Sequence, residues 1–218
     1  QMQKLTTTKP LFILLYGSPG SGKTNFARQL CEVLPCAHLQ SDRIRAELFE
    51  KPSFSTDENE VVDNLNEFMA EQFLQAGVSV ILDENADRAA KRMSLRNMAR
   101  SKKAEPVLVW LQTDFESAYA RLQRRDRRKA DDKYAAAYST EMFKQAISRM
   151  QNPKNEDYVV ISGKHTFNTQ RNTIVRHLIE KGLVERTQET PITKPGLVNL
   201  VPQSQGRVNM ARRNVLIR

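Results

Sequence analysis

A glycine-rich loop follows the first apolar run of the chain and reads Gly17-Ser18-Pro19-Gly20-Ser21-Gly22-Lys23-Thr24. The run before it, residues 11–16, predicts a buried strand, and residues 25–34 carry apolar side chains at helical spacing. A strand, a glycine loop that ends in Lys-Thr, and a helix form a phosphate-binding loop when they occur in this order. A glycine-rich turn before an ordinary helix would not explain the Lys-Thr pair.

The whole loop, from Gly17 to Thr24, is therefore expected to bind nucleotide phosphates. Its glycines let successive backbone N–H groups point inward, and the helix N-terminus adds partial positive charge at the same place. Lys23 is expected to reach the terminal phosphates, and the hydroxyl of Thr24 is expected to ligate a metal ion. The predicted cofactors are ATP and Mg²⁺.

The composition is compatible with one sizeable core and a basic surface. The chain has 218 residues, 39% of them hydrophobic, and a formal net charge of +9, which favours polyanionic partners such as nucleotides or nucleic acid. Cys31 and Cys36 form no metal-binding pattern with the three histidines, and reduced thiols of a cytoplasmic protein are expected. No apolar run approaches membrane-spanning length.

Apolar runs and helical patterns alternate along the chain. They predict five strands, at residues 11–16, 37–40, 78–82, 107–111 and 158–163. They predict helices at residues 25–34, 44–49, 57–75, 88–101, 114–122, 140–150 and 169–181, with Ser41 or Asp42 capping the second and Thr56 or Asp57 the third. The predicted fold class is α/β, a doubly wound, five-stranded parallel sheet. Residues 1–184 are expected to form this domain, and 185–218 a basic C-terminal appendage.

Polar residues follow the ends of two predicted strands, where ligands bind in such sheets. Asp83 is expected to hold the metal, and Asp42 to act as general base toward an attacking hydroxyl, although a helix cap would also explain Asp42. Arg45 lies three residues after Asp42 and is predicted to bind an acceptor's phosphate or carboxylate. Asn85 and Arg88 are predicted to contact the substrate.

An arginine cluster ends the predicted helix at 114–122. It comprises Arg121, Arg124, Arg125, Arg127 and Arg128. Because phosphoryl transfer needs positive charge on the transferred group, residues 121–137 are predicted to form a lid with Arg125 and Arg121 catalytic and Arg128 in contact with the cofactor. A solvated helix face is the alternative for most of these arginines. A second basic set, which includes Lys91, Arg92 and Arg96, is expected on the surface.

Together these residues resemble a family of phosphate-loop kinases that includes phage-type polynucleotide 5′-kinases, zeta-toxin-like kinases and bacterial AAA-like kinases. The matching pieces are the loop 17–24, Ser41-Asp42-Arg43-Ile44-Arg45, Leu82-Asp83-Glu84-Asn85 and the arginines of 121–128, within residues 10–165. The resemblance implies a kinase-type architecture with an arginine-rich lid, Asp42 as general base and Arg45 on the acceptor's phosphate.

The leading hypothesis is an ATP-dependent phosphotransferase that moves the γ-phosphate of ATP·Mg to a hydroxyl. The acceptor favoured by the charge is a nucleic-acid 5′ end or RNA. A small metabolite or a nucleotide sugar is the alternative acceptor. Two other classes are a nucleotide-switched binding protein without transfer activity, and a plain nucleic-acid-binding module, for which no aromatic stacking motif accompanies the arginines.

Overall fold

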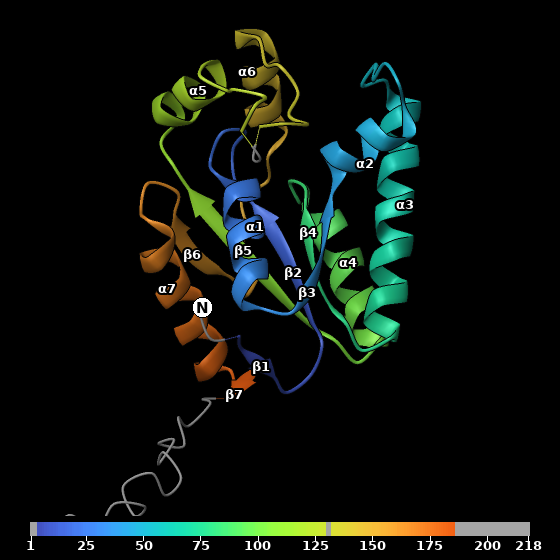
Figure 1. Cartoon of the computed structure of the whole chain (residues 1–218), viewed down its shortest axis with the longest axis vertical. Coiled ribbons are helices and arrows are strands. Elements are labelled where there is room, and N and C mark those ends of the chain that lie inside the picture. The colour runs from blue at the N-terminus through green and yellow to red at the C-terminus, as the bar shows by residue number, and fades with distance from the viewer. Residues whose placement is uncertain (1–3, 130–131, 186–218) are drawn as a thin grey trace, which may run out of the picture. The chain divides into compact units, whose positions relative to one another are not determined.

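The computed structural model describes residues 4–129 and 132–185 and is built around a five-stranded parallel sheet. Its strands are β2 (Leu11–Tyr16), β3 (Cys36–Gln40), β4 (Ser79–Asp83), β5 (Glu105–Gln112) and β6 (Val159–Ser162). They lie in the order β3-β4-β2-β5-β6, with β2 in the centre (Figure 1). The strand order changes direction beside β2, so the loop after β2 lies where open α/β sheets bind ligands.

Helices cover both faces of the sheet. The side chains of α1 (Lys23–Val33) and α7 (Phe167–Glu180) pack in one apolar core with Leu11, Ile13 and Leu15 of β2. The other core contains α3 (Thr56–Gln75), α4 (Ala89–Ser101) and the alternate β2 residues Phe12, Leu14 and Tyr16. Every β2 side chain is buried, as expected for a central parallel strand covered on both faces.

Two further helices, α5 (Phe115–Gln123) and α6 (Thr140–Arg149), lie above the carboxyl ends of the strands (Figure 1). A small apolar cluster of Ala118, Leu122 and Phe143 joins them, separate from the two cores of the sheet. On the opposite side of the same edge stands α2 (Ser41–Leu48), which follows β3 directly. The region between these two groups is where the phosphate-binding loop ends.

The predicted fold class is confirmed, and a small ribbon adds to it. Strands β1 (Thr6–Thr7) and β7 (Val184–Glu185) pair antiparallel, so Glu185, predicted to begin the appendage, belongs to this ribbon. The remainder of the predicted appendage, 186–218, lies outside the described residues. Among the helices that the structure describes, none is both long enough and apolar enough to cross a bilayer.

Three local predictions were wrong, two because of tertiary contacts and one because the helix begins one residue earlier than expected. Neither Ser41 nor Asp42 caps α2, since the helix begins at Ser41 and the Ser41 hydroxyl donates to Glu84. Ser55, not Thr56 or Asp57, caps α3. Arg92, predicted at the surface, is fully buried; its guanidinium binds both carboxylate oxygens of Glu156 and the carbonyl of Ala86.

Candidate active site

The loop between β2 and α1 wraps closely against its neighbours. A Cβ atom at Gly17 would lie 2.6 Å from the Leu111 carbonyl oxygen, and one at Gly20 would lie 2.2 Å from that of Ala118. Gly22 precedes α1 with a left-handed φ of 97°. The buried hydroxyls of Ser18 and Ser21 have no hydrogen-bond partner among the described residues. Since buried polar groups normally have partners, these two hydroxyls fit a loop built to receive a polar ligand.

The close packing at Gly20 predicts that substitution by alanine destabilises the protein more than backbone strain alone would. Gly77 has nearly the same φ, +80° against +79°, but open space around its Cα. We expect Gly77→Ala to lose about 1–2 kcal/mol of unfolding free energy, the cost of the left-handed conformation. Gly20→Ala is expected to lose about 1–3 kcal/mol more, because the Ala118 carbonyl is backbone and cannot turn away. Urea unfolding of both variants measures the difference, and equal losses would contradict the close packing.

Lys23 begins α1, and its side chain turns back over the loop. The Nζ atom donates to the carbonyl oxygens of Gly17 at 2.8 Å and Ser18 at 3.0 Å. Burial of the ammonium lowers the pKa of Lys23 to about 8, against the opposing effect of Asp83. A bound terminal phosphate would offer this ammonium a stronger, charge-assisted partner than two neutral carbonyls.

Thr24 and Asp83, predicted as metal ligands, lie together although they come from different elements. The Thr24 hydroxyl donates to Asp83 Oδ1 at 3.2 Å, and His38 Nε2 lies 2.9 Å from Oδ2 of the same carboxylate. Although burial opposes it, the hydrogen bond to Asp83 raises the pKa of His38. Mg²⁺ prefers oxygen ligands and is commonly held by one or two protein groups together with substrate phosphates. The donor set of Thr24 and Asp83 therefore fits Mg²⁺.

Asp42 lies in the first turn of α2 and lines the same cleft as Lys23. Within the described residues, no hydrogen bond engages its carboxylate, which leaves both oxygens available. Burial raises the pKa of Asp42, and the neighbouring Asp83 raises it further, while Arg125, Arg45 and Lys23 act in the opposite direction. A part-buried carboxylate with a raised pKa has the properties of a general base.

Arg45 lines the cleft as predicted, but its guanidinium already has protein partners. Nη1 donates to Glu58 at 2.7 Å and Nη2 to Asn59 at 2.8 Å, and this ion pair is almost completely buried. The Nε group alone lacks a partner among the described residues. The expected bidentate grip of Arg45 on an acceptor anion would have to break the Glu58 pair, which makes a structural role the stronger interpretation.

The arginines of the predicted lid, 121–137, divide into two groups; residues 130–131 of this segment lie outside the described residues. Arg125 Nη1 donates to the Ala136 carbonyl at 2.9 Å, and its charge acts on both Lys23 and Asp42. Arg121 reaches the loop, since its Nη1 lies 3.8 Å from the Cβ position at Gly22. Arg128 instead pairs with Asp126, its side chain 91% exposed, and does not line the cleft. The structure therefore brings two of the three predicted arginines to the site.

The two predicted substrate-binding residues after β4, Asn85 and Arg88, differ in their position relative to the cleft. Asn85 lines the cleft and accepts a hydrogen bond from the Gly17 N–H at 3.2 Å, so it holds the start of the loop. Arg88 is exposed at the N-terminus of α4 and is not among the described residues that line the cleft, so its contact with substrate stays a prediction.

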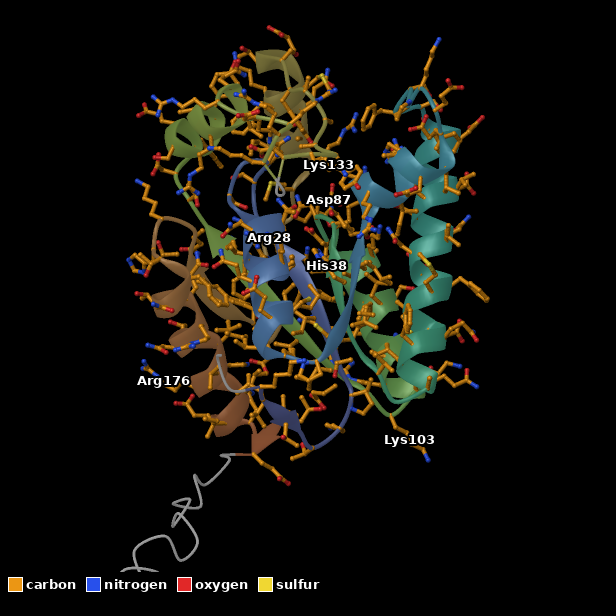
Figure 2. The ribbon with its side chains drawn as sticks, viewed as in Figure 1. Arg28, His38, Asp87, Lys103, Lys133 and Arg176 are labelled. Carbon is orange, nitrogen blue, oxygen red and sulfur yellow. The ribbon has the colours of Figure 1, made fainter. Side chains whose placement is uncertain are left out.

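One cleft of about 950 Å³ joins these groups. The predicted residues that line it are Pro19, Gly20, Gly22, Lys23, Thr24, Asp42, Arg45, Asp83, Asn85, Arg121 and Arg125. Its lining includes residues of α2, α5 and α6, the helices beside the carboxyl ends of the strands in Figure 1, and Asp87, which is labelled in Figure 2. The residues predicted to bind phosphate, to hold a metal ion and to accept a proton thus line one cavity.

Sequence reasoning missed several residues at this site. His38 was set aside as one of three scattered histidines, and nothing local connects it with Asp83. Gly163 directly follows β6 and packs against the loop, where a Cβ atom would clash with the Ser21 carbonyl oxygen. A glycine directly after a strand was the available signal. Phe54 and Tyr138 line the cleft without any motif.

The chain belongs to the AAA_33 family of AAA domains, whose family model matches residues 12–153. In curated proteins no sequence match was found. The five-stranded parallel sheet and its glycine-rich loop form a fold that solved structures of kinases share.

Solved structures share this fold at low sequence identity. A putative kinase from Chloroflexus aurantiacus is 17% identical, with a TM-score of 0.62, covering 78% of this chain and 100% of that one. Kti12 of Chaetomium thermophilum in complex with ADP-AlF₃ is 18% identical, with a TM-score of 0.61 and coverage of 80% and 100%. The APS kinase CysC of Mycobacterium tuberculosis in complex with AMPPNP and APS is 19% identical, with a TM-score of 0.58 and coverage of 78% and 98%.

Proposed function

We propose that this protein is an ATP-dependent phosphotransferase that moves the γ-phosphate of ATP·Mg to a hydroxyl acceptor, in the cytoplasm. One observation carries the proposal: a single cleft brings together Lys23, the Thr24–Asp83 pair and the carboxylate of Asp42, which has no hydrogen-bond partner among the described residues. Phosphate binding alone requires the loop but not a free carboxylate beside it. Phosphoryl transfer to a hydroxyl requires both.

Each residue has a role that its position supports. Backbone N–H groups of the loop and the Lys23 ammonium hold the phosphates, and Thr24 and Asp83 are the groups that would hold Mg²⁺. Mg²⁺ held by these two residues would supply positive charge that offsets the negative charge of the phosphates. Asp42 accepts the proton of the attacking hydroxyl. Arg121 and Arg125 place positive charge on the lid side, where it stabilises the transferred phosphoryl group.

A nucleotide-switched binding protein without transfer activity is the competing function. It would use the same loop and metal pair, but it has no need of a carboxylate held free of hydrogen bonds beside Lys23. Asp42 therefore favours transfer. For the acceptor, the net charge of +9 favours a nucleic-acid 5′ end or RNA over a small metabolite or nucleotide sugar.

Transfer of labelled γ-phosphate from ATP·Mg to a panel of acceptors tests the proposal. The panel contains DNA and RNA with 5′-hydroxyl ends, nucleosides, nucleotide sugars, sugars and amino alcohols. We expect at least one acceptor to be labelled by the parent protein and not by Lys23→Ala. ATP binding without labelling of any acceptor would favour the nucleotide-switched function instead.

A further inference from the structure

An exposed aromatic ring lies at the cleft in a strained backbone conformation. Phe54 stands in the loop between α2 and α3 with a φ of 57°, and 42% of the residue is exposed. For a bulky side chain this left-handed conformation is rare and costs free energy. Such strain persists only where surrounding contacts hold it in place, and it occurs most often at functional sites.

The contacts that hold Phe54 come from one buried carboxylate. Glu58 is 6% exposed and accepts hydrogen bonds from the Phe54 N–H, from the N–H and hydroxyl of Ser53, and from Arg45. Asn59 holds the second backbone group of Phe54, since its Nδ2 donates to the Phe54 carbonyl at 3.3 Å. These bonds satisfy both backbone groups of Phe54, so the ring is held at the cleft rather than packed in a core.

The Arg45 guanidinium carbon lies over one face of the Phe54 ring, 4.7 Å from its centre. Among the described residues, no second cation or aromatic ring is stacked on Phe54. This arrangement explains why Arg45 is tied to Glu58 and Asn59: the paired guanidinium forms a fixed support behind the ring. The same cleft is lined by Asp42, by the lid arginines and by Arg149. An aromatic face together with cationic side chains is the combination that binds single-stranded nucleic acid.

We propose that Phe54 is a stacking platform for the base of a nucleic-acid acceptor, positioned so that the terminal hydroxyl of that acceptor reaches Asp42. This inference rests on the proposed phosphotransferase function and names the class of its acceptor. The ring sets specificity by favouring a flat base beside the reactive hydroxyl.

Binding without ATP tests the platform independently of transfer. The probe is a fluorescein-labelled DNA oligonucleotide with a 5′-hydroxyl end, compared by anisotropy with the same oligonucleotide carrying an abasic 5′-terminal residue. We expect the parent protein to bind the base-bearing end about tenfold more tightly or better. Phe54→Leu, which keeps apolar bulk but removes the flat ring, is expected to lose this preference, and Phe54→Trp to retain it.

The matched control is Phe68→Leu, because Phe68 is 59% exposed on α3 and does not line the cleft. Its preference for the base should equal that of the parent, and unchanged ADP binding by Phe54→Leu shows that the variant is folded. Equal affinity of the parent for the two ends, a preference that persists in Phe54→Leu, or no binding of either oligonucleotide would overturn the proposal. A ring-dependent base preference without phosphate transfer would support the platform and contradict the proposed function alone.

Discussion

Lys23→Ala is expected to reduce phosphate transfer by about 10²- to 10³-fold and to weaken ATP binding, the loss typical of removing one group that stabilises developing charge. The ammonium lies over the loop, within hydrogen-bond distance of two of its carbonyls, and would turn to the terminal phosphates of a bound nucleotide. Transfer is measured with the acceptor that the panel identifies, and nucleotide affinity by calorimetry with ADP.

The unfolding temperature of Lys23→Ala shows whether reduced transfer comes from the missing ammonium or from a destabilised fold. Burial lowers the pKa of Lys23 to about 8, below its ordinary 10.5, so the charged form is disfavoured in the folded protein. This penalty is absent above pH 10.5, grows as the pH falls to 8 and is complete below pH 8. At neutral pH the alanine variant should therefore unfold at the temperature of the parent or above.

Arg176→Ala is the matched control, since it removes one positive charge from the exposed face of α7, away from the cleft (Figure 2). Parent-like transfer by this control is expected. Parent-like transfer by Lys23→Ala would refute the role of the loop.

Asp42→Asn is expected to reduce transfer by about 10²- to 10⁴-fold, the range contributed by a positioned acid or base. The amide keeps the shape of the side chain but cannot take the proton of the attacking hydroxyl. Nucleotide affinity is expected to remain, because the phosphates are held by the loop. Measurement of transfer and of ADP binding on the same preparation separates the two effects.

The pH dependence of the transfer rate is a second test of Asp42 as general base. Burial raises the pKa of Asp42, and the parent's transfer rate should rise with pH as this carboxyl loses its proton. The Asn variant should lack that limb of the profile. Asp57→Asn is the control, because Asp57 also lies in the first turn of a helix, α3, but is exposed. Unchanged turnover of Asp42→Asn would assign Asp42 a structural role at the start of α2.

Local sequence was sufficient for much of the fold. The order of strand, glycine loop and helix between residues 11 and 34 is read from neighbouring residues, and the parallel sheet follows from apolar runs that alternate with helical patterns. The pairing of Thr24 with Asp83 was also predictable, because the carboxyl ends of adjacent parallel strands meet at one edge. Helix starts were less predictable: Ser41 turns its hydroxyl to Glu84 across the fold instead of capping its own helix.

The residues on the acceptor side of the cleft were the least predictable from the sequence. Sequence alone placed Arg45 on an acceptor's phosphate and found no aromatic stacking motif to accompany the arginines of 121–128. In the folded chain Glu58 takes the Arg45 guanidinium, and Phe54 is held beside it at the cleft. The sequence spacing of Arg45, Phe54 and Glu58 does not predict these contacts, because the contacts depend on how α2 and α3 pack.

The sequence by itself determined that this protein has a phosphate-binding loop on a parallel α/β sheet, because these features depend on residues that are neighbours along the chain. Only the tertiary structure decided which charged groups are free to act. His38 meets Asp83 across 45 residues, and Arg92 is buried against Glu156. Arg45 is paired with Glu58, whereas no hydrogen bond from the described part of the chain engages the Asp42 carboxylate. Those outcomes depend on burial and on long-range partners, which set the charge state and the availability of a side chain.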